Sequence, residues 1–190
     1  MIGYAELIEM LESSPVIAAI KNNQDLYHCL TCNCKVVFVL YGNVNSIADI
    51  VSRLKNSSKI VFVHIDLLDG LSAREAAVDF LAKNTHIDGI ISTKPSLIRY
   101  STSLNLLTIQ RFFVLDSLAL ENIRKADQND GADLIEILPG LMPKIIKMLS
   151  IELEKPLIAG GLISDKEDVI TALSAGAIAI SSTNHSVWSM

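Results

Sequence analysis

Glycines and hydroxyl side chains stand at the ends of two neighbouring apolar runs near the C-terminus, PLIAGG and AIAISST. Glycine lets a backbone approach an anion closely with its amide hydrogens aimed at it, and serine and threonine add hydroxyl donors. The pattern predicts a phosphate site, although paired glycines also ease an ordinary strand-to-helix turn. The residues predicted to bind the phosphate are Gly160, Gly161, Leu162, Ser181, Ser182, Thr183 and Lys94.

Polar side chains also interrupt or follow other apolar runs, and we expect Asp66, Gln110, Arg111 and Glu136 to bind ligand hydroxyls there. Glu136 lies inside the run LIEIL. A buried carboxylate is costly unless it is paired or solvated, so we expect Glu136 to point toward a ligand and to pair with Lys94 or Arg111. Asp66, Lys94 and Glu136 could instead form the acid/base set of a sugar-phosphate isomerase or aldolase.

Two further polar residues flank these positions. His64 lies two residues before Asp66, and we interpret it as a hydrogen-bonded core histidine rather than a catalyst. Asp116 lies just beyond the apolar run 107–115. Because the same residue types serve a catalytic site and a ligand sensor, spacing alone does not separate an enzyme from a regulator.

Eight short apolar runs, each typical of a strand, must position these side chains. They are residues 15–20, 35–42, 59–66, 88–93, 107–115, 134–138, 156–161 and 177–183. Helical patterns lie between them, as at 46–56, where apolar residues recur at intervals of three and four. Ser46 is the expected N-cap of that helix, and Ser72 with Glu75 and Ser164 with Glu167 fit the capping box that opens a helix.

Strands that alternate with helices predict βαβ units, and eight units predict a compact (β/α)8 barrel of the TIM type. The 190 residues fall below the ~250 typical of this fold, so its helices must be short, and the ending NHSVWSM leaves a last helix of one turn or none. An open doubly wound sheet is the alternative, but no G-x-G-x-x-G follows the first run. Residues 1–190 are expected to form a single domain, because no linker or low-complexity tract divides them.

Composition indicates a soluble cytoplasmic protein. Half of the residues are hydrophobic, but no apolar run approaches the ~20 residues that a membrane helix requires. The first fourteen residues include three glutamates and no basic residue, which is unlike a signal peptide. Three cysteines, an odd and small number, indicate a reducing environment.

The sequence HCLTCNC places His28, Cys29, Cys32 and Cys34 within seven residues. Imidazole and thiolate are zinc ligands, but a closed zinc site usually combines two separated pairs, and no second C-x-x-C or H-x-x-x-H follows. Cysteine is also a common small apolar residue of protein cores. We therefore expect no metal here and assign the cluster no role.

Several long stretches of the chain resemble the glycerol uptake operon antiterminator family. They read VFVHIDLLDGLS, DGIISTKPSLI, TIQRFFVLDSLALEN, IEILPGLMPKII and IAGGLISDKEDVITALSAGAIAISST, and the resemblance extends from Pro15 to Trp188. It implies a barrel-shaped regulator, not an enzyme, that senses glycerol 3-phosphate as its effector and has no other cofactor. With that metabolite bound, such a protein acts on leader mRNA and prevents premature termination of glycerol uptake genes. The alternative is a barrel enzyme acting on a small phosphorylated substrate.

The charge of the chain gives no independent support to RNA binding. The formal net charge is −5, whereas nucleic-acid-binding proteins usually carry a basic face. Arg124, Lys125, Lys144 and Lys147 could form a local basic patch, or they could be ordinary solvated helix surface. RNA binding thus follows from the resemblance alone. An acidic chain can bind RNA as a homo-oligomer that concentrates basic patches, or it can act through a partner, and the sequence leaves both open.

Overall fold

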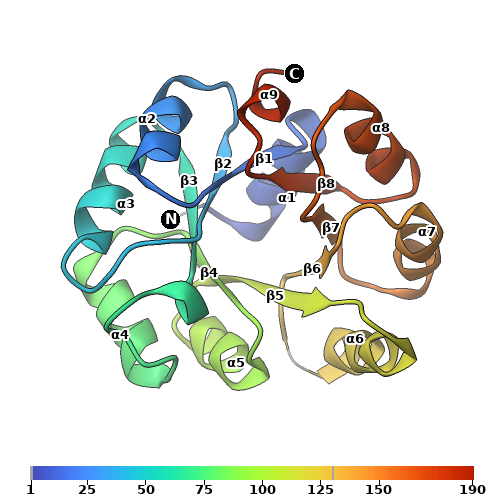
Figure 1. The fold of residues 1–190 in the computed structure, drawn as a ribbon. Coiled ribbons are helices and arrows are strands. Elements are labelled where there is room, and N and C mark those ends of the chain that lie inside the picture. The colour runs from blue at the N-terminus through green and yellow to red at the C-terminus, as the bar shows by residue number, and fades with distance from the viewer. Residues whose placement is uncertain (1, 130) are drawn as a thin grey trace.

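A closed barrel of eight parallel strands forms the centre of the molecule, as the computed structural model of residues 2–129 and 131–190 shows (Figure 1). Each strand pairs with the next along the chain, and the last pairs with the first. The predicted (β/α)8 barrel is confirmed. The strands are β1 (Val16–Ile20), β2 (Val36–Val39), β3 (Ile60–His64), β4 (Gly89–Ser92), β5 (Leu107–Phe113), β6 (Leu134–Leu138), β7 (Leu157–Gly160) and β8 (Ala179–Ser182).

A helix follows each strand, and together these helices form a ring around the barrel (Figure 1). They are α2 (Asn23–Thr31), α3 (Ile47–Asn56), α4 (Glu75–Asn84), α5 (Pro95–Ser103), α6 (Ser117–Asn129), α7 (Pro143–Glu152), α8 (Lys166–Ser174) and α9 (His185–Trp188). The last of them, α9, has four residues, which confirms the shortened final helix. None of the helices in the described part of the chain is long and apolar enough to cross a membrane.

Alternate residues of the strands pack on opposite faces, because successive side chains of a strand point to opposite sides of the sheet. Phe38, Phe62 and Ile109 belong to the apolar cluster that fills the barrel interior. Their neighbours along the strands face the helices, where two further apolar clusters lie. An additional helix, α1 (Tyr4–Ser13), precedes the barrel and packs Leu7 and Leu11 into the interior cluster. We predicted no helix or strand for this segment from the sequence.

The expected helix caps are only partly correct. Ser46 occupies the N-cap position of α3, but its side chain makes no cap hydrogen bond and instead accepts one from the Asn43 amide. The proposed boxes that begin at Ser72 and Ser164 are wrong, because α4 begins after Arg74 and α8 begins after Asp165. The Asp165 side chain accepts a hydrogen bond from the Asp168 amide, so the cap of α8 lies one residue later than predicted.

Candidate functional site

A buried ion pair lies inside the barrel near the carboxyl ends of the strands. Arg111 on β5 and Glu136 on β6 are paired across the sheet, with Arg111 Nε 2.6 Å from Glu136 Oε2. The other carboxylate oxygen, Oε1, accepts a hydrogen bond of 2.6 Å from Ser181 Oγ on β8. All three residues are buried, and Glu136 is 0% exposed. Of the two partners proposed for Glu136, the structure therefore selects Arg111. We call these three residues the mouth cluster.

Gly160 is required by the mouth cluster itself. A Cβ atom at this position would lie 2.5 Å from both Glu136 Oε1 and Ser181 Oγ, which is closer than side-chain atoms pack. The glycine at the end of β7 thus leaves room for the carboxylate and the hydroxyl. This gives Gly160 a structural reason to be glycine in addition to the predicted approach of its backbone to an anion.

His64 lies at the end of β3, and sequence reasoning misjudged it. The residue is 3% exposed, and its Nδ1 atom has no hydrogen-bond partner in the described structure. The nearest carboxylate oxygen, Asp66 Oδ2, is 3.9 Å away, which is beyond hydrogen-bond length. Burial, followed by the charge of Arg111, lowers the His64 pKa to about 4, so the imidazole is neutral near pH 7. The expected burial of His64 is confirmed, but the expected hydrogen bonding fails at Nδ1, which leaves an unpartnered polar atom buried at the barrel mouth.

Asp66 braces the ends of two strands. It lies in a short 3-10 turn (Ile65–Leu67) after β3, and its carboxylate accepts hydrogen bonds from the Ser92 hydroxyl and from the Thr93 amide and hydroxyl. These contacts tie β3 to the loop after β4. Since both carboxylate oxygens already accept hydrogen bonds, Asp66 has less capacity to bind a ligand hydroxyl than we predicted from the sequence.

The loops after β7 and β8 lie side by side, as the phosphate prediction requires. Gly161 and Leu162 have φ values of 75° and 64°, and such a conformation is unusual for leucine. Unusual backbone conformations of this kind cluster at functional sites. The Ser182 hydroxyl donates to Ile163 O and accepts from the Asn184 amide, which joins the two loops. Thr183 is exposed beside them.

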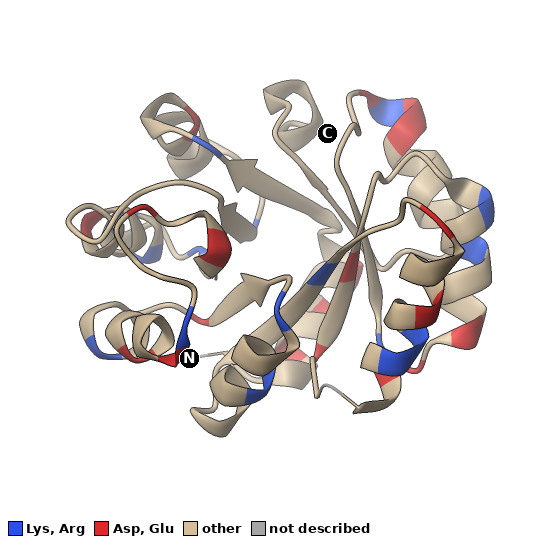
Figure 2. Ribbon diagram, turned by 60° about the horizontal axis from the view of Figure 1, so that its bottom comes forward, with Lys and Arg blue, Asp and Glu red and all other residues tan. Residues whose placement is uncertain are grey.

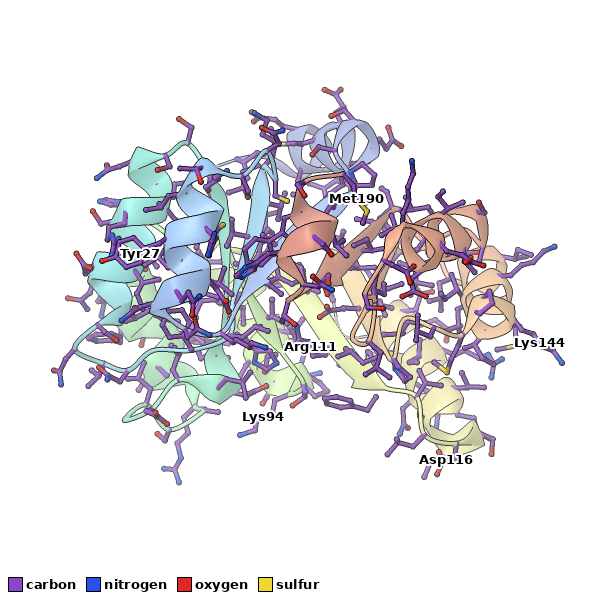
Figure 3. All side chains as sticks on the ribbon, turned by 45° about the horizontal axis from the view of Figure 1, so that its top comes forward. Tyr27, Lys94, Arg111, Asp116, Lys144 and Met190 are labelled. Carbon is purple, nitrogen blue, oxygen red and sulfur yellow. The ribbon has the colours of Figure 1, made fainter. Side chains whose placement is uncertain are left out.

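Lys94 lies across the barrel from these loops. It follows β4, whereas β7 and β8 lie on the opposite side of the ring of strands, and its Nζ donates to Ala73 O at 3.2 Å. Figure 3 shows Arg111 near the middle of the barrel and Lys94 toward its edge. The structure therefore does not bring Lys94 together with the other predicted phosphate residues, because the closed strand order separates β4 from β8.

Lys21 is the basic residue that sequence reasoning missed. It directly follows β1, which pairs with β8. Ala19, two residues earlier, belongs to the interior cluster, so Lys21 continues the inward-facing side of β1. Together with Asp25, Thr183 and His185 it lines a depression of about 440 Å³. The sequence indicated a role for Lys21 only through its position directly after the first apolar run. Lys21 comes to lie beside the β8 loop because the barrel closes between β1 and β8.

Gln110 faces away from the mouth cluster. Ile109 lies in the interior cluster and Arg111 in the mouth cluster, so the intervening Gln110 points to the outer side of β5. It is fully buried there and helps to line a depression of about 480 Å³ that also includes Lys125 of α6. The prediction that Gln110 and Arg111 contact the same ligand inside the barrel conflicts with this alternation. Asp116 lies farther out and accepts a hydrogen bond from the Ala119 amide at the start of α6.

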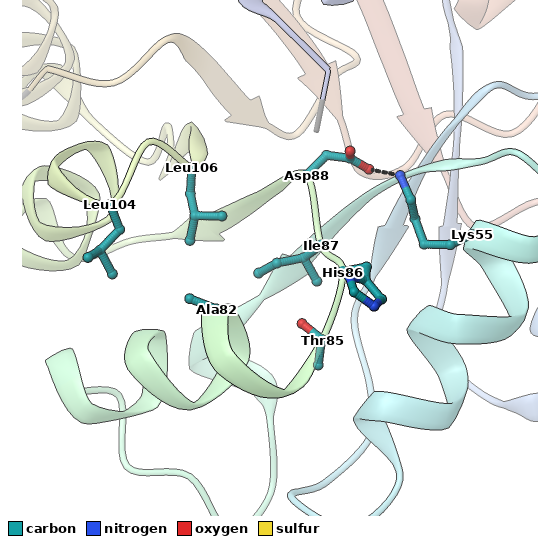
Figure 4. A pocket seen from close by; sticks show the side chains of 8 residues that line it. All are labelled: Lys55, Ala82, Thr85, His86, Ile87, Asp88, Leu104 and Leu106. Carbon is teal, nitrogen blue, oxygen red and sulfur yellow. Dashed lines mark hydrogen bonds and ion pairs between the residues drawn. The ribbon is translucent and has the colours of Figure 1, made fainter.

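A separate cavity of about 260 Å³ lies near the start of β4, between the ends of α3, α4 and α5 (Figure 4). Its charged residues are Lys55 and Asp88, whose Nζ and Oδ2 atoms are 2.5 Å apart. The same Asp88 oxygen also accepts a hydrogen bond from the Val61 amide. Because this carboxylate is occupied by structural partners at the amino ends of the strands, the mouth remains the stronger candidate site.

Basic residues lie on several helices, among them α3, α4, α6, α7 and α8. In the view of Figure 2, basic and acidic segments are interspersed on the helices. Lys125 of α6 and Lys144 and Lys147 of α7 are exposed. Arg124 forms an ion pair of 2.9 Å with Glu152. Within the part of the chain that the structure describes, no group of three or more His, Cys, Asp and Glu side chains is placed to hold a metal ion.

Residues 16–188 match the family model described as glycerol-3-phosphate responsive antiterminator. The chain belongs to this family. An uncharacterised protein of Escherichia coli K12, YgcP, is 42% identical to it over 184 residues, which is 97% of this chain and 96% of that protein.

Two solved structures related to glycerol uptake operon antiterminators resemble this member of the family. The regulatory protein from Listeria monocytogenes has a TM-score of 0.87 and 34% identity, covering 91% of this chain and 94% of that one. The antiterminator-related protein from Thermotoga maritima has a TM-score of 0.81 and 29% identity, covering 93% of this chain and 99% of that one. Membership of the family was predicted from the sequence and is confirmed.

Proposed function

We propose that this protein is a cytoplasmic regulator, not an enzyme, that binds glycerol 3-phosphate at the barrel mouth and then acts on leader mRNA to prevent premature termination. The observation that carries the proposal is the family match over residues 16–188, combined with adjacent β7 and β8 loops above a buried polar cluster. In barrels of this type, phosphate groups commonly bind to the loops after strands 7 and 8.

The phosphate is assigned to the backbone of Gly161 and Leu162 and to Thr183, with Lys21 as the nearby cation. An exposed lysine and a glycine turn supply the positive charge and the close backbone approach that a phosphate requires. Lys94 is left out of this assignment because its ammonium contacts Ala73 O on the other side of the barrel.

The glycerol hydroxyls are assigned to the interior side of the same site. His64 offers a buried Nδ1 atom without a partner, and a neutral imidazole can donate or accept through this atom according to its tautomer. Arg111 has further guanidinium donors besides the Nε that contacts Glu136. Leaving a buried polar atom unpaired costs free energy, and a ligand hydroxyl that pairs with His64 removes this cost.

Calorimetry with glycerol 3-phosphate tests the ligand assignment, and the chain offers a matched control. Lys21→Met and Lys94→Met remove the same charge from exposed positions on opposite sides of the barrel. We expect Lys21→Met to weaken binding by about tenfold or more, in keeping with a lost charge-assisted contact, and Lys94→Met to change it less than about twofold. Equal losses in both variants would show that only the net charge matters, and no binding by the wild type would reject the ligand site.

Leader-RNA binding with and without glycerol 3-phosphate tests the regulatory step. If the metabolite raises RNA affinity, RNA must raise metabolite affinity by the same factor, because the two equilibria are linked. We assign RNA binding to the exposed lysines of α6 and α7, and a homo-oligomer would bring two such surfaces together. RNA affinity that does not respond to the metabolite would refute the proposal. Steady conversion of glycerol 3-phosphate to a product would instead support a barrel enzyme.

A further inference from the structure

The three cysteines of the chain gather where α2 ends and β2 begins. Cys29 lies on the last turn of α2, and Cys32 follows the helix with its amide donating to Cys29 O at 3.3 Å. Cys34 lies just before β2. Cys29 and Cys34 are buried and Cys32 is half-buried, and all three are free thiols. The proposed ligand site uses none of them.

A buried lysine contacts this group of thiols. Lys59 is 6% exposed, and its ammonium donates to Cys32 O at 2.6 Å and to Cys34 O at 2.8 Å. Its third contact is Cys32 Sγ at 3.9 Å. In the described part of the chain Lys59 has no carboxylate partner. A buried ammonium requires a compensating charge, and a Cys32 thiolate is placed to supply it.

The neighbouring thiols favour the same ionisation. The neighbouring thiols of Cys29 and then Cys34 lower the pKa of Cys32, partial burial opposes this shift, and the charge of Lys59 lowers the pKa further. The same contacts with Cys32, together with burial, raise the pKa values of Cys29 and Cys34. Cys32 is therefore the cysteine of this cluster that ionises most readily, beside the Lys59 ammonium and next to two thiols that stay protonated.

Cys32 is also accessible to a small reagent. With His28, Asn33 and Trp188 it lines a cavity of about 250 Å³ at the surface between α2 and α9. The other two thiols lie behind it in the apolar core. A reactive cysteine is one that is ionised to the thiolate and that a reagent can reach, and Cys32 is the residue of this cluster that meets both conditions.

We propose that Cys32 is a reactive thiolate and that Cys32 and Cys29 form a peroxide-sensitive dithiol. In the first step the Cys32 thiolate attacks one oxygen of hydrogen peroxide, the O–O bond breaks to leave a sulfenic acid on Cys32, and the released hydroxide takes up the proton that the thiol lost on ionisation and leaves as water. In the second step the Cys29 sulfur attacks the Cys32 sulfenic acid, the S–O bond breaks, and the thiol proton leaves with hydroxide as water. Two thiols and one hydrogen peroxide thus give one disulfide and two waters.

Cys29 is assigned as the resolving thiol because it lies one helical turn before Cys32. Cys32 is the C-cap residue of α2 and its amide donates to Cys29 O, so the backbones of the two cysteines are already joined at the end of the helix. Cys34 is held differently, since its thiol donates to Trp188 O at 3.6 Å. Trp188 in turn donates through Nε1 to Ser182 O and lines the same cavity as Cys32, so the cysteine cluster adjoins the segment that follows β8.

Alkylation of the folded protein by iodoacetamide at different pH values tests the thiolate. The tryptic peptide 22–35 contains all three cysteines, and fragmentation within it locates the modified residue. An ordinary thiol with a pKa near 8.5 reacts more than about 100-fold more slowly at pH 6 than at pH 8.5. We expect Cys32 to lose less than about tenfold over this interval. In Lys59→Met, the pH dependence of Cys32 alkylation should move toward that of an ordinary thiol. An ordinary profile for Cys32 in the wild type overturns the proposal, whether or not the lysine variant folds.

Treatment with hydrogen peroxide tests the resolving thiol. In the wild type, the peptide 22–35 should lose two hydrogens, and in Cys34→Ala it should do the same. In Cys29→Ala, the reaction should stop at a Cys32 sulfenic acid that dimedone traps. Three free thiols after peroxide treatment of the wild type overturn the proposal, and a disulfide formed in Cys29→Ala but not in Cys34→Ala overturns the assignment of Cys29.

Discussion

Replacing Glu136 by glutamine should leave the charge of Arg111 buried without a counter-charge. The two side chains are 6% and 0% exposed, so water cannot take the place of the lost carboxylate. Glutamine keeps an oxygen that can accept from Ser181, and the substitution therefore removes mainly the charge. Breaking a buried ion pair by removing one partner costs about 3–5 kcal/mol of stability. We expect a loss of this size in the free energy of unfolding, measured by urea denaturation.

The chain contains a matched control on its surface. Arg124 and Glu152 are 2.9 Å apart, but their side chains are 40% and 39% exposed. Glu152→Gln makes the same chemical change in an exposed pair, where the cost should be about 0–1 kcal/mol. A cost for Glu136→Gln no greater than that for Glu152→Gln would refute the argument that burial sets the value of the Arg111 pair.

A double-mutant cycle separates the charge pair from other effects of the substitution. In Arg111→Met with Glu136→Gln, no uncompensated charge remains in the barrel. The double variant should therefore recover at least about 2 kcal/mol relative to the sum of the two single costs, within the range measured for residues in direct contact. Additive costs would show that the two residues stabilise the barrel independently.

Three further variants test single features of the barrel mouth. The His64 pKa falls from 6.5 to about 4 on folding, so the unfolded state holds the proton more tightly. The free energy of unfolding should therefore decline by about 3 kcal/mol as the pH falls from 6.5 to 4. His64→Gln should lack this part of the pH dependence. Gly161→Ala should cost about 1–2 kcal/mol in urea unfolding, since φ is 75° there, and no loss would mean that the turn readily changes conformation. Asp165→Ala should lower stability by about 1 kcal/mol by removing the cap of α8, whereas an unchanged melting temperature would contradict that cap.

The sequence by itself determined the elements of the barrel and their order. Each of the eight apolar runs contains one strand. These features are local, because a strand buried on both faces must be apolar along its whole length. Boundaries of helices were less certain: Asp165 was passed over as the cap of α8 because Ser164 offers a similar side chain one residue earlier.

The sequence also indicated a cluster at the mouth, but only the tertiary structure decided which side chains meet. Alternation along β5 sends Gln110 outward and Arg111 inward, although they are neighbours in sequence. Closure of the barrel puts Lys21 beside the β8 loop and leaves Lys94 on the far side. Residue types near a strand end indicate which chemistry is possible. The partners of each side chain are fixed by the face of the strand on which it lies and by the place of that strand in the ring. Both depend on contacts between distant parts of the chain.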